Sequence, residues 1–487
     1  MDDLTTKMCL MGVGMATASY DVFAINLVLL ILKNLYTISS FESSVISTSA
    51  LLGMATGQAL FGWVGDRIGR QRSAVLTCSL LIVGALGSAL GAWGFGGSVL
   101  TLALTLSAWR FLLGIGVGGE YPVTAIFTSE SSSSSPGGRK RGTNIAAVFS
   151  SQGIGNLCAS VVMLVVLAVL PQDRLQYAWR LALLLGAIPA ALMLAPRCFL
   201  TESAAFQKAN QQQPPPPPPT PGFVDDDLEK LSINNAVASA AAAAASASAA
   251  KPSFLLIVSL YWRQLVGTAG CWLVFDVVFY GNSLFTSTLL DLAGLANEPG
   301  WVGIADNVAF NVVIALIALP GYWLAVLLVD VVGRRPLQLT GFAMMAVIYI
   351  LMGTTYTTLQ RYPIVFVVLY GFSYLFANAG PNTTTFILPT ESFPTVVRST
   401  CHGFSAASGK LGAVVGSFLM NPIMAAIGVG QTLVLCGALA ILGFVLTYFF
   451  VPETKDLDMN ELDQQYEKML LESKASQIMH EDSSLIC

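Results

Sequence analysis

About twelve apolar stretches, each long enough to cross a lipid bilayer as a helix, run through nearly the whole chain. A spanning helix takes about 20 predominantly apolar residues. Only 11% of the 487 residues are charged and 54% are hydrophobic, whereas roughly a quarter of an ordinary soluble domain is charged. The pattern predicts an all-α membrane protein embedded in a lipid bilayer and excludes a water-soluble fold. The stretches lie at residues 8–32, 43–63, 73–94, 98–122, 143–170, 177–199, 256–289, 302–329, 336–357, 362–388, 400–427 and 430–451.

Charge, cysteine and histidine content argue against three other classes of protein. The net charge is -4, and the basic residues form short clusters rather than one broad patch, so no nucleic-acid partner is expected. The eight cysteines are scattered, with no CxxC spacing, so we expect neither a metal site nor a cofactor. No nucleophile and base stand together to suggest an enzyme, since His402 and His480 are the two histidines.

Residues 201–253 differ in composition from the apolar stretches on either side. They contain QQQPPPPPPT, the acidic string VDDDLEK and a long Ala/Ser run. Proline cannot donate the hydrogen bonds of a helix, so this block should be extended and solvated. We expect a hydrophilic linker between an N-terminal six-helix half at 1–200 and a C-terminal six-helix half at 254–451. Residues 452–487, rich in Glu, Asp and Lys, are expected to form a solvated tail.

Basic residues in the short loops predict the orientation in the membrane. Arg70, Arg141, Arg334 and Arg398 follow the second, fourth, eighth and tenth spans, so all four loops lie on one side, and the opposite side is poor in basic residues. Loops rich in Lys and Arg stay in the cytoplasm. Both termini, the linker and the tail should therefore be cytoplasmic, and we expect the plasma membrane as the location. The oligomeric state stays open.

The loops after the second and eighth spans carry the same motif, D-x-x-G-R. The first copy, in GDRIGRQR, has Asp66 and Arg70, and the second, in VDVVGRRP, has Asp330 and Arg334. A single copy has an equally good local explanation, an aspartate cap, a glycine turn and an arginine at the membrane face. Two copies in equivalent loops indicate the major facilitator fold, because a conformation-dependent latch between two halves needs one motif on each side.

The fourth and tenth spans also end alike. Glu130 is followed by a basic loop that ends in Arg141, and Glu391 is followed by a loop that ends in Arg398. We expect these four residues to take part in gating with the two D-x-x-G-R motifs.

Polar residues recur at matching depths in both halves when the spans are aligned on these motifs. Tyr121 in the first half corresponds to Asn382 in the second, and Gln152 corresponds closely to Lys410. The repeat is parallel, because six spans per half preserve the orientation.

Five charged residues fall within or at the ends of apolar spans, where ionised side chains are costly and functional candidates by default. They are Asp21, Arg110, Glu120, Asp276 and Lys410. For Arg110 and Glu120 a structural role is equally open. Lys410, among small residues in SAASGKLGA, needs a buried anion, which is either a carboxylate such as Asp21 or a substrate.

Asp276 has the most informative neighbours. Trp272, Asp276 and Tyr280 are spaced at i, i+4 and i+8, so they lie along one helix face. That face offers an indole N–H donor, an acceptor and a hydroxyl. The alternative is an aromatic stripe packed against a neighbouring helix with one satisfied acid.

Several strings resemble the phosphate:proton symporters of the major facilitator superfamily, the type found in fungi and plants. The most specific is residues 376–413, which read FANAGPNTTTFILPTESFPTVVRSTCHGFSAASGKLGA. Further matches are YDVF at 20–23, GGEYP at 118–122 and the W-x3-D-x3-Y motif at 272–280. The resemblance covers essentially all twelve spans. It implies twelve transmembrane helices in two six-helix halves.

The resemblance also implies roles for individual residues. Asp21 corresponds to the proton-linked acid of the first span and Lys410 to a functional lysine; with Glu120 and Asp276 they form the expected proton-coupling set. The family usually has GGDYP where this chain has Glu120 in GGEYP. The residues that correspond to the phosphate pocket are Tyr121, Gln152, Trp272, Asp276, Tyr280 and Asn382.

The expected function is proton-coupled import of inorganic phosphate by alternating access, with phosphate and protons as the transported partners. Three alternatives stay open. Related carriers of glycerophosphodiesters also have Glu in the GGEYP position, and LTES at 200–203 with VPETK at 451–455 resembles the sugar porters. The third alternative is a transporter-like phosphate sensor, which would bind phosphate but move little of it.

Overall fold

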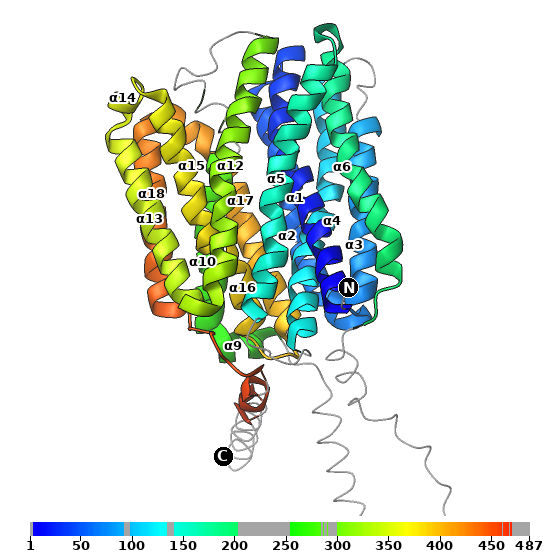
Figure 1. Ribbon diagram of the computed structural model, residues 1–487, viewed down its shortest axis with the longest axis vertical. Coiled ribbons are helices and arrows are strands. Elements are labelled where there is room, and N and C mark those ends of the chain that lie inside the picture. The colour runs from blue at the N-terminus through cyan, green and yellow to red at the C-terminus, as the bar shows by residue number, and fades with distance from the viewer. Residues whose placement is uncertain are drawn as a thin grey trace, which may run out of the picture.

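Long helices run side by side through the bundle in the computed structural model (Figure 1). The structure describes residues 3–91, 98–133, 141–202, 254–283, 286, 290, 300–459, 461–466 and 468–469. The predicted linker from residue 203 onward and the last part of the tail lie outside these described residues.

The N-terminal helices, together called the N-half, correspond to the first six predicted spans. The third of them ends in a π-helical turn, η1. Their bounds are α1 (Asp3–Leu35), α2 (Ser40–Ile68), α3 (Arg70–Leu86), η1 (Gly87–Gly91), α4 (Val99–Ser133), α5 (Arg141–Val169), the short 3-10 turn η4 (Gln172–Arg174) and α6 (Leu175–Cys198).

The C-terminal helices, called the C-half, correspond to the last six predicted spans. Two of these spans are interrupted, the seventh by the π-helical turn η5 and the tenth at Gly380. The bounds are α9 (Phe254–Leu265), η5 (Val266–Gly270), α10 (Cys271–Ser283), α12 (Trp301–Val332), α13 (Arg334–Thr354), α14 (Tyr356–Leu359), α15 (Pro363–Ala379), α16 (Pro381–Glu391), α17 (Arg398–Ile427) and α18 (Val429–Phe450).

Eleven helices of the described part are long and apolar enough to cross a membrane by these two criteria alone. The twelfth is α17, which is as long as the others but carries Lys410, His402 and many small residues. Its glycines let it pack closely against both halves, because Gly403 lies against Gly62 of α2 and Gly412 against the backbone of α10. The predicted fold, twelve membrane helices in two six-helix halves, is confirmed.

The glycine of each D-x-x-G-R motif separates two helices. Gly69, between α2 and α3, has φ 96°, and Gly333, between α12 and α13, has φ 104°. Side chains with a Cβ rarely adopt this conformation. The same sharp break therefore recurs in both halves, at the end of the bundle called here the charged end, the lower end in Figure 1.

The segment after α18 is less exposed than its acidic composition suggested. Tyr466 is 5% exposed and belongs to a cluster with Tyr261 of α9, Phe393 and Cys401. The chain packs there because Leu462, Tyr466 and Met469 recur at i, i+4 and i+7 and so share one helix face. The expectation of a solvated tail, which came from composition, did not take this stripe into account.

Candidate functional site

A buried ion pair joins helices α10 and α17 of the C-half. The ammonium group of Lys410 (α17) donates to Oδ2 of Asp276 (α10) at 2.7 Å and to the hydroxyl of Tyr280 at 3.1 Å. Lys410 Nζ also lies 4.2 Å from the ring centroid of Tyr280 and 5.3 Å from that of Tyr121. Both charged side chains are 2% exposed. A lysine so enclosed is stabilised by a carboxylate and by the negative faces of two aromatic rings.

The residues one turn before and one turn after Asp276 on α10 show what this helix face contacts. The π-helical turn η5 directly precedes α10, and such turns often occur at functional sites. Trp272 packs on Gly409, where a Cβ would strike the indole, and stands edge-on to His402 with ring centroids 5.8 Å apart. Tyr280 stacks on Phe23 of α1 at 6.1 Å with nearly parallel rings. The predicted helix face is therefore real, and it faces both α17 and the N-half.

The N-half supplies two polar side chains to the same place. The hydroxyl of Tyr121 (α4) approaches Oε1 of Gln152 (α5) at 3.4 Å, a long hydrogen bond. The same hydroxyl interacts with that of Tyr280. Tyr121 and Gln152 are buried, so they face the Asp276–Lys410 pair across the contact between the halves.

Asn382 reaches the site because the tenth span is broken. Gly380 has non-helical angles and Pro381 starts α16, as expected where proline follows a residue that cannot stay helical. The side-chain amide of Asn382 donates to the Tyr322 hydroxyl at 3.0 Å and to Oδ1 of Asn378 at 2.8 Å. Tyr322 in turn lies within electrostatic reach of Tyr121. Five of the six residues predicted for the substrate pocket thus lie in one connected cluster, and Trp272 lies one turn before Asp276, packed on Gly409 next to Lys410.

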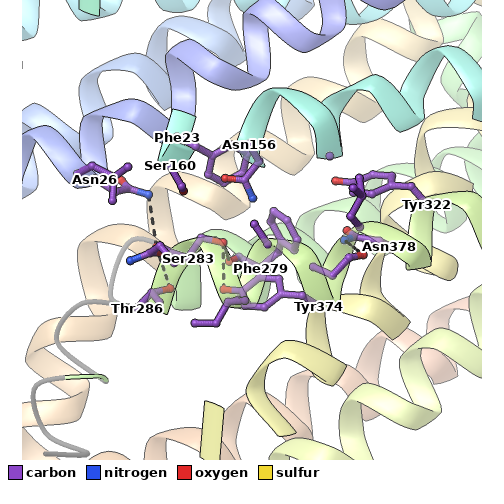
Figure 2. A pocket seen from close by; sticks show the side chains of 17 residues that line it. Phe23, Asn26, Asn156, Ser160, Phe279, Ser283, Thr286, Tyr322, Tyr374 and Asn378 are labelled. Atoms are coloured by element: carbon purple, nitrogen blue, oxygen red, sulfur yellow. Dashed lines mark hydrogen bonds between the residues drawn. The ribbon is translucent and has the colours of Figure 1, made fainter. Parts of the chain in front are cut away.

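A cavity adjoins this cluster without including the ion pair. Its volume is about 40 Å³, room for a few water molecules, it is partly open to solvent, and both halves line it (Figure 2). It touches the cluster through Gly153 beside Gln152, and through Tyr322 and Asn378, which bond to Asn382. From the directions of α1, α10 and α12, it lies on the side of the site away from the charged end.

Asp21 stands apart from Lys410. Its side chain is buried against Gly186 of α6, and neither carboxylate oxygen has a hydrogen-bond partner. Arg110 of α4 is also buried and donates through Nη2 to the backbone carbonyl of Asp21 at 2.6 Å. The possibility that Asp21 serves as the counter-ion of Lys410 is not realised here, because Asp276 takes that place.

Glu120 does not join the substrate cluster. Both of its oxygens accept hydrogen bonds from the guanidinium of Arg197 near the end of α6, one of them at 2.8 Å. Thr77 adds a further hydrogen bond at 2.9 Å. Glu120 and Arg197 are both buried, so the predicted proton-coupling carboxylate has a fully formed base partner that the sequence did not single out.

Each of the buried carboxylates Asp21, Glu120 and Asp276 has a buried basic residue close to it. Asp276 pairs with Lys410 and Glu120 with Arg197. Asp21 and Arg110 interact electrostatically. When both members of each pair are ionised, their charges cancel. An anion that enters this interior therefore brings negative charge that these three pairs do not neutralise.

The charged end carries one ion-pair cluster of the N-half. Arg70 donates to Glu130 at 2.9 Å and to the backbone carbonyl of Gly65 at 2.7 Å. Glu202, after α6, accepts from the backbone N–H groups of Arg70 and Gln71 at 3.0 and 3.2 Å. Because an acid at a helix N-terminus satisfies free N–H groups, Glu202 also fixes the start of α3.

The C-half repeats this cluster in detail. Arg334 donates twice to Glu391 at 2.9 Å and once to the backbone carbonyl of Val329 at 3.2 Å. Glu453, after α18, accepts from the backbone N–H groups of Arg334 and Arg335, both at 3.1 Å. Glu202 lies in the LTES string and Glu453 in the VPETK string, so these strings mark the second acid of each cluster.

Contacts between the two clusters join the halves at the charged end. Arg141 of α5 bonds to Glu391 at 3.0 Å. Asp330 accepts from the backbone N–H and the hydroxyl of Thr143 at 2.8 and 2.7 Å. Arg398 lies within electrostatic reach of Glu130. Of the eight residues predicted for gating, seven thus lie in this network, and the side chain of Asp66 is outside the described part of the chain.

Some residues of the site were missed by sequence reasoning. Tyr322 stands two residues after Pro320 in α12, and Asn378 stands four residues before Asn382, a spacing that could have been noticed. Arg197 carried no signal beyond its position at the end of the sixth span. Its partner Glu120 is far away in the sequence.

Comparisons with known proteins agree on the family and on the fold. The family model "Sugar (and other) transporter" matches residues 10–466. "Probable inorganic phosphate transporter 1-6" of Arabidopsis thaliana is 34% identical over 96% of this chain and 95% of its own length. "Inorganic phosphate transporter 1-6" of Oryza sativa subsp. japonica is 33% identical over 94% of this chain and 92% of its own.

Solved structures of a proton:xylose symporter, XylE, have the same fold. The form bound to 6-bromo-6-deoxy-D-glucose superposes with a TM-score of 0.73, covering 95% of this chain and 98% of that one at 21% identity. The inward-open form from E. coli gives 0.67 at 21% identity, covering 95% of this chain and 99% of that one.

Proposed function

The chain belongs to the sugar (and other) transporter family of multi-pass membrane proteins, and from this premise we propose that it imports inorganic phosphate together with protons by alternating access. Its relatives with inorganic phosphate in their names match it along nearly their full length. We further propose that the protein works as a carrier and not as an enzyme.

The observation that carries the proposal is the Asp276–Lys410 pair with hydrogen-bond donors around it. A buried lysine held between aromatic rings attracts an anion. Neutral donors of the kind that bind phosphate oxygens are close by. The hydroxyl of Tyr280 and the ring of Tyr121 contact the lysine, the amides of Gln152 and Asn382 adjoin through Tyr121 and Tyr322, and the indole of Trp272 lies on the helix face of Asp276. A sugar would not need a central acid and base, so the charge of this site favours an anion.

Protons resolve the conflict between phosphate and the acid. An ionised Asp276 repels phosphate and holds Lys410, whereas a protonated Asp276 releases the lysine and donates its own hydrogen bond to the anion. Phosphate carries one to two negative charges near neutral pH, and a negative-inside potential opposes its import. We therefore propose that Asp276 takes up a proton from outside before or with phosphate.

Asp21 and Glu120 complete the proposed proton-coupling set in different ways. The Asp21 carboxylate has no hydrogen bond to lose on protonation. Glu120 would have to release the guanidinium of Arg197, which is a larger rearrangement. Asp21 is therefore the better second proton site, and Glu120 would act only in a state in which Arg197 has moved.

Alternating access would open and close the charged end. In the present arrangement Arg141–Glu391 and Asp330–Thr143 hold the halves together there. We propose that this end faces the cytoplasm of a plasma membrane, because basic loops stay on the cytoplasmic side. Release of phosphate then requires that these contacts between the halves separate.

The test is uptake of radiolabelled phosphate into vesicles that contain the purified protein. We expect accumulation when the outside is more acidic than the inside, faster uptake at lower external pH, and loss of accumulation with a protonophore. Binding of phosphate without uptake would instead identify a sensor. Uptake that ignores the pH gradient would contradict proton coupling.

A further inference from the structure

His402 of α17 is a buried titratable side chain that has no role in the proposed proton-coupling set. Its Nε2 atom lies 3.2 Å from the backbone carbonyl oxygen of Phe386 in α16. Because a carbonyl oxygen only accepts hydrogen bonds, Nε2 carries the hydrogen of the neutral ring and Nδ1 keeps the basic lone pair. Nδ1 is buried and has no hydrogen-bond partner in the described part of the chain. The ring can therefore accept a proton at Nδ1.

The surroundings of the His402 ring are aromatic. Trp272 stands edge-on to it at a centroid distance of 5.8 Å, and Phe386 does so at 5.6 Å. A buried imidazolium without a countercharge is costly, so the ring is neutral in the present arrangement. Histidine is nevertheless the side chain that gains and loses a proton most readily near neutral pH. Once water reaches the ring, it can take up a proton.

His402 lies between the central site and the charged end. On α17 it comes four residues after Arg398, which lies at the charged end, and eight residues before Lys410. About 12 Å of helix therefore separates it from the lysine. Its neighbour Trp272 lies one turn before Asp276 on α10. A proton that leaves Asp276 toward the charged end thus passes the level of His402.

Contacts between the halves cover this region. Phe386 stacks on Phe149 of α5 with ring centroids 4.5 Å apart. Gly403, the residue after His402, lies against the backbone of Gln58 in α2. The Gln58 side chain is also buried, and neither of its polar atoms has a partner among the described residues. Opening of the charged end would move α2 and α5 away from the C-half and admit water to these unpartnered groups.

Acidic side chains on the helices packed against α17 already have basic partners. The pairs are Asp276 of α10 with Lys410, Glu391 of α16 with Arg334, and Glu130 of α4 with Arg70. On α17 itself, Arg398 donates to the backbone carbonyl of Phe393, and on α4 Tyr121 meets the ring of Phe386 edge-on at 6.0 Å. None of these acids bonds to His402, so no countercharge would retain a proton there.

We propose that His402 carries the proton from Asp276 to the cytoplasm after phosphate has left. Water that enters the open charged end takes the proton from the Asp276 carboxyl group, whose O–H bond breaks, and an N–H bond forms at Nδ1. Asp276 is then ionised and pairs again with Lys410. The imidazolium gives its Nδ1 proton to cytoplasmic water and returns to the neutral ring. This role rests on the proposed function, in which Asp276 brings the proton in.

The test separates two kinds of phosphate transport in vesicles. Exchange of labelled for unlabelled phosphate at equal pH uses only the loaded, protonated carrier, so it needs no proton release. Net accumulation driven by an acid-outside gradient needs that release in every cycle. His402→Gln keeps an amide that can donate to the Phe386 carbonyl but removes the basic nitrogen. We expect its net uptake to fall about tenfold or more, with exchange close to that of the wild type.

His480→Gln makes the same substitution at the second histidine, outside the described part of the chain, and should leave both rates unchanged. Net uptake by His402→Gln at the wild-type rate would overturn the proposal. If His402→Gln shows no exchange, His402→Asn is measured in the same way. Equal loss of exchange and net uptake in both variants would also overturn the proposal, because it would indicate a structural role. Wild-type protein that exchanges phosphate without gradient-driven uptake would instead contradict the proposed function.

Discussion

Buried carboxylates in this protein differ in what each one contacts. Glu120 is bonded to a guanidinium and to Thr77, Asp276 to an ammonium group, and Asp21 to no hydrogen-bond donor. A satisfied buried pair resists change, because loss of one partner leaves the other charge unpaired. From these surroundings we expect Glu120 to contribute mainly to stability and Asp276 to transport.

Glu120→Gln should destabilise the protein, since it leaves Arg197 buried without a countercharge. Breaking such a pair costs about 3–5 kcal/mol. The double variant Glu120→Gln/Arg197→Gln should recover part of this loss. Denaturant unfolding in detergent measures both. Strictly additive effects in the double variant, or a single variant as stable as the wild type, would rule out the structural role.

Asp276→Asn should abolish uphill phosphate accumulation, because an amide cannot carry the proton. The variant should lose stability, because Lys410 stays buried without a countercharge, but it should still fold, since the side-chain carbonyl of asparagine can accept a hydrogen bond from the lysine; the amount of folded protein in the vesicles is therefore measured with transport. Phosphate accumulation and the number of protons taken up per phosphate are measured together in vesicles. Normal accumulation with normal proton stoichiometry would contradict the assignment. Ser259→Ala, in α9 and away from the cluster, serves as a control and should transport normally.

At the scale of elements, glycine contacts decide how closely the helices approach. Gly57 of α2 and Gly118 of α4 each lie directly against the backbone of the other helix. Small residues permit such contacts in membrane helices. Because α4 carries Tyr121 and α2 contacts α17, this packing also sets the width of the substrate site.

Gly57→Ala should therefore be destabilising, as its methyl group would strike the backbone of Ile115. Overpacking costs about 1–3 kcal/mol. The matched control is Gly270→Ala, where the added methyl group meets only Leu446 at an ordinary 3.5 Å. Thermal unfolding in detergent compares the two variants. Equal melting temperatures would show that α2 and α4 can separate without cost.

At the scale of the whole molecule, the segment after α18 ties the two halves at the charged end. Thr454 donates to Glu391 at 2.6 Å, and Asp463 accepts from the backbone N–H of Thr395 at 2.7 Å. Arg141 of the N-half reaches the backbone carbonyl of Leu457 at 3.4 Å. The segment thus bonds to Arg141 and Glu391, the same residues that join the halves at this end.

Tyr466→Ala should expose Cys401, which is buried in the cluster under Tyr466. In a protein whose other cysteines are replaced, we expect thiol labelling at least tenfold faster than with Tyr466 intact, since a local change of about 1.4 kcal/mol has that effect. Glu461→Ala, on an exposed position of the same segment, should label at the original rate. Unchanged labelling in Tyr466→Ala would mean that the segment does not cover α17.

Much of the fold was determined by features that are local along the chain. The lengths of the apolar stretches predicted the spanning helices, and two copies of D-x-x-G-R predicted the repeated clusters around Arg70 and Arg334. The W-x3-D-x3-Y spacing placed Asp276 and Tyr280 on one helix face. A periodicity or a repeated motif needs no knowledge of which helices are neighbours.

Only the tertiary structure decided which charges meet. From the sequence, the anion beside Lys410 was either a carboxylate such as Asp21 or a substrate. In the structure Lys410 pairs with Asp276, because the glycines of α17 bring this helix against α10. Glu120 meets Arg197 across residues far apart in the sequence, and the cavity lies between helices of both halves. Such contacts depend on distances between helices, and those distances follow from side-chain packing that no single stretch of sequence contains.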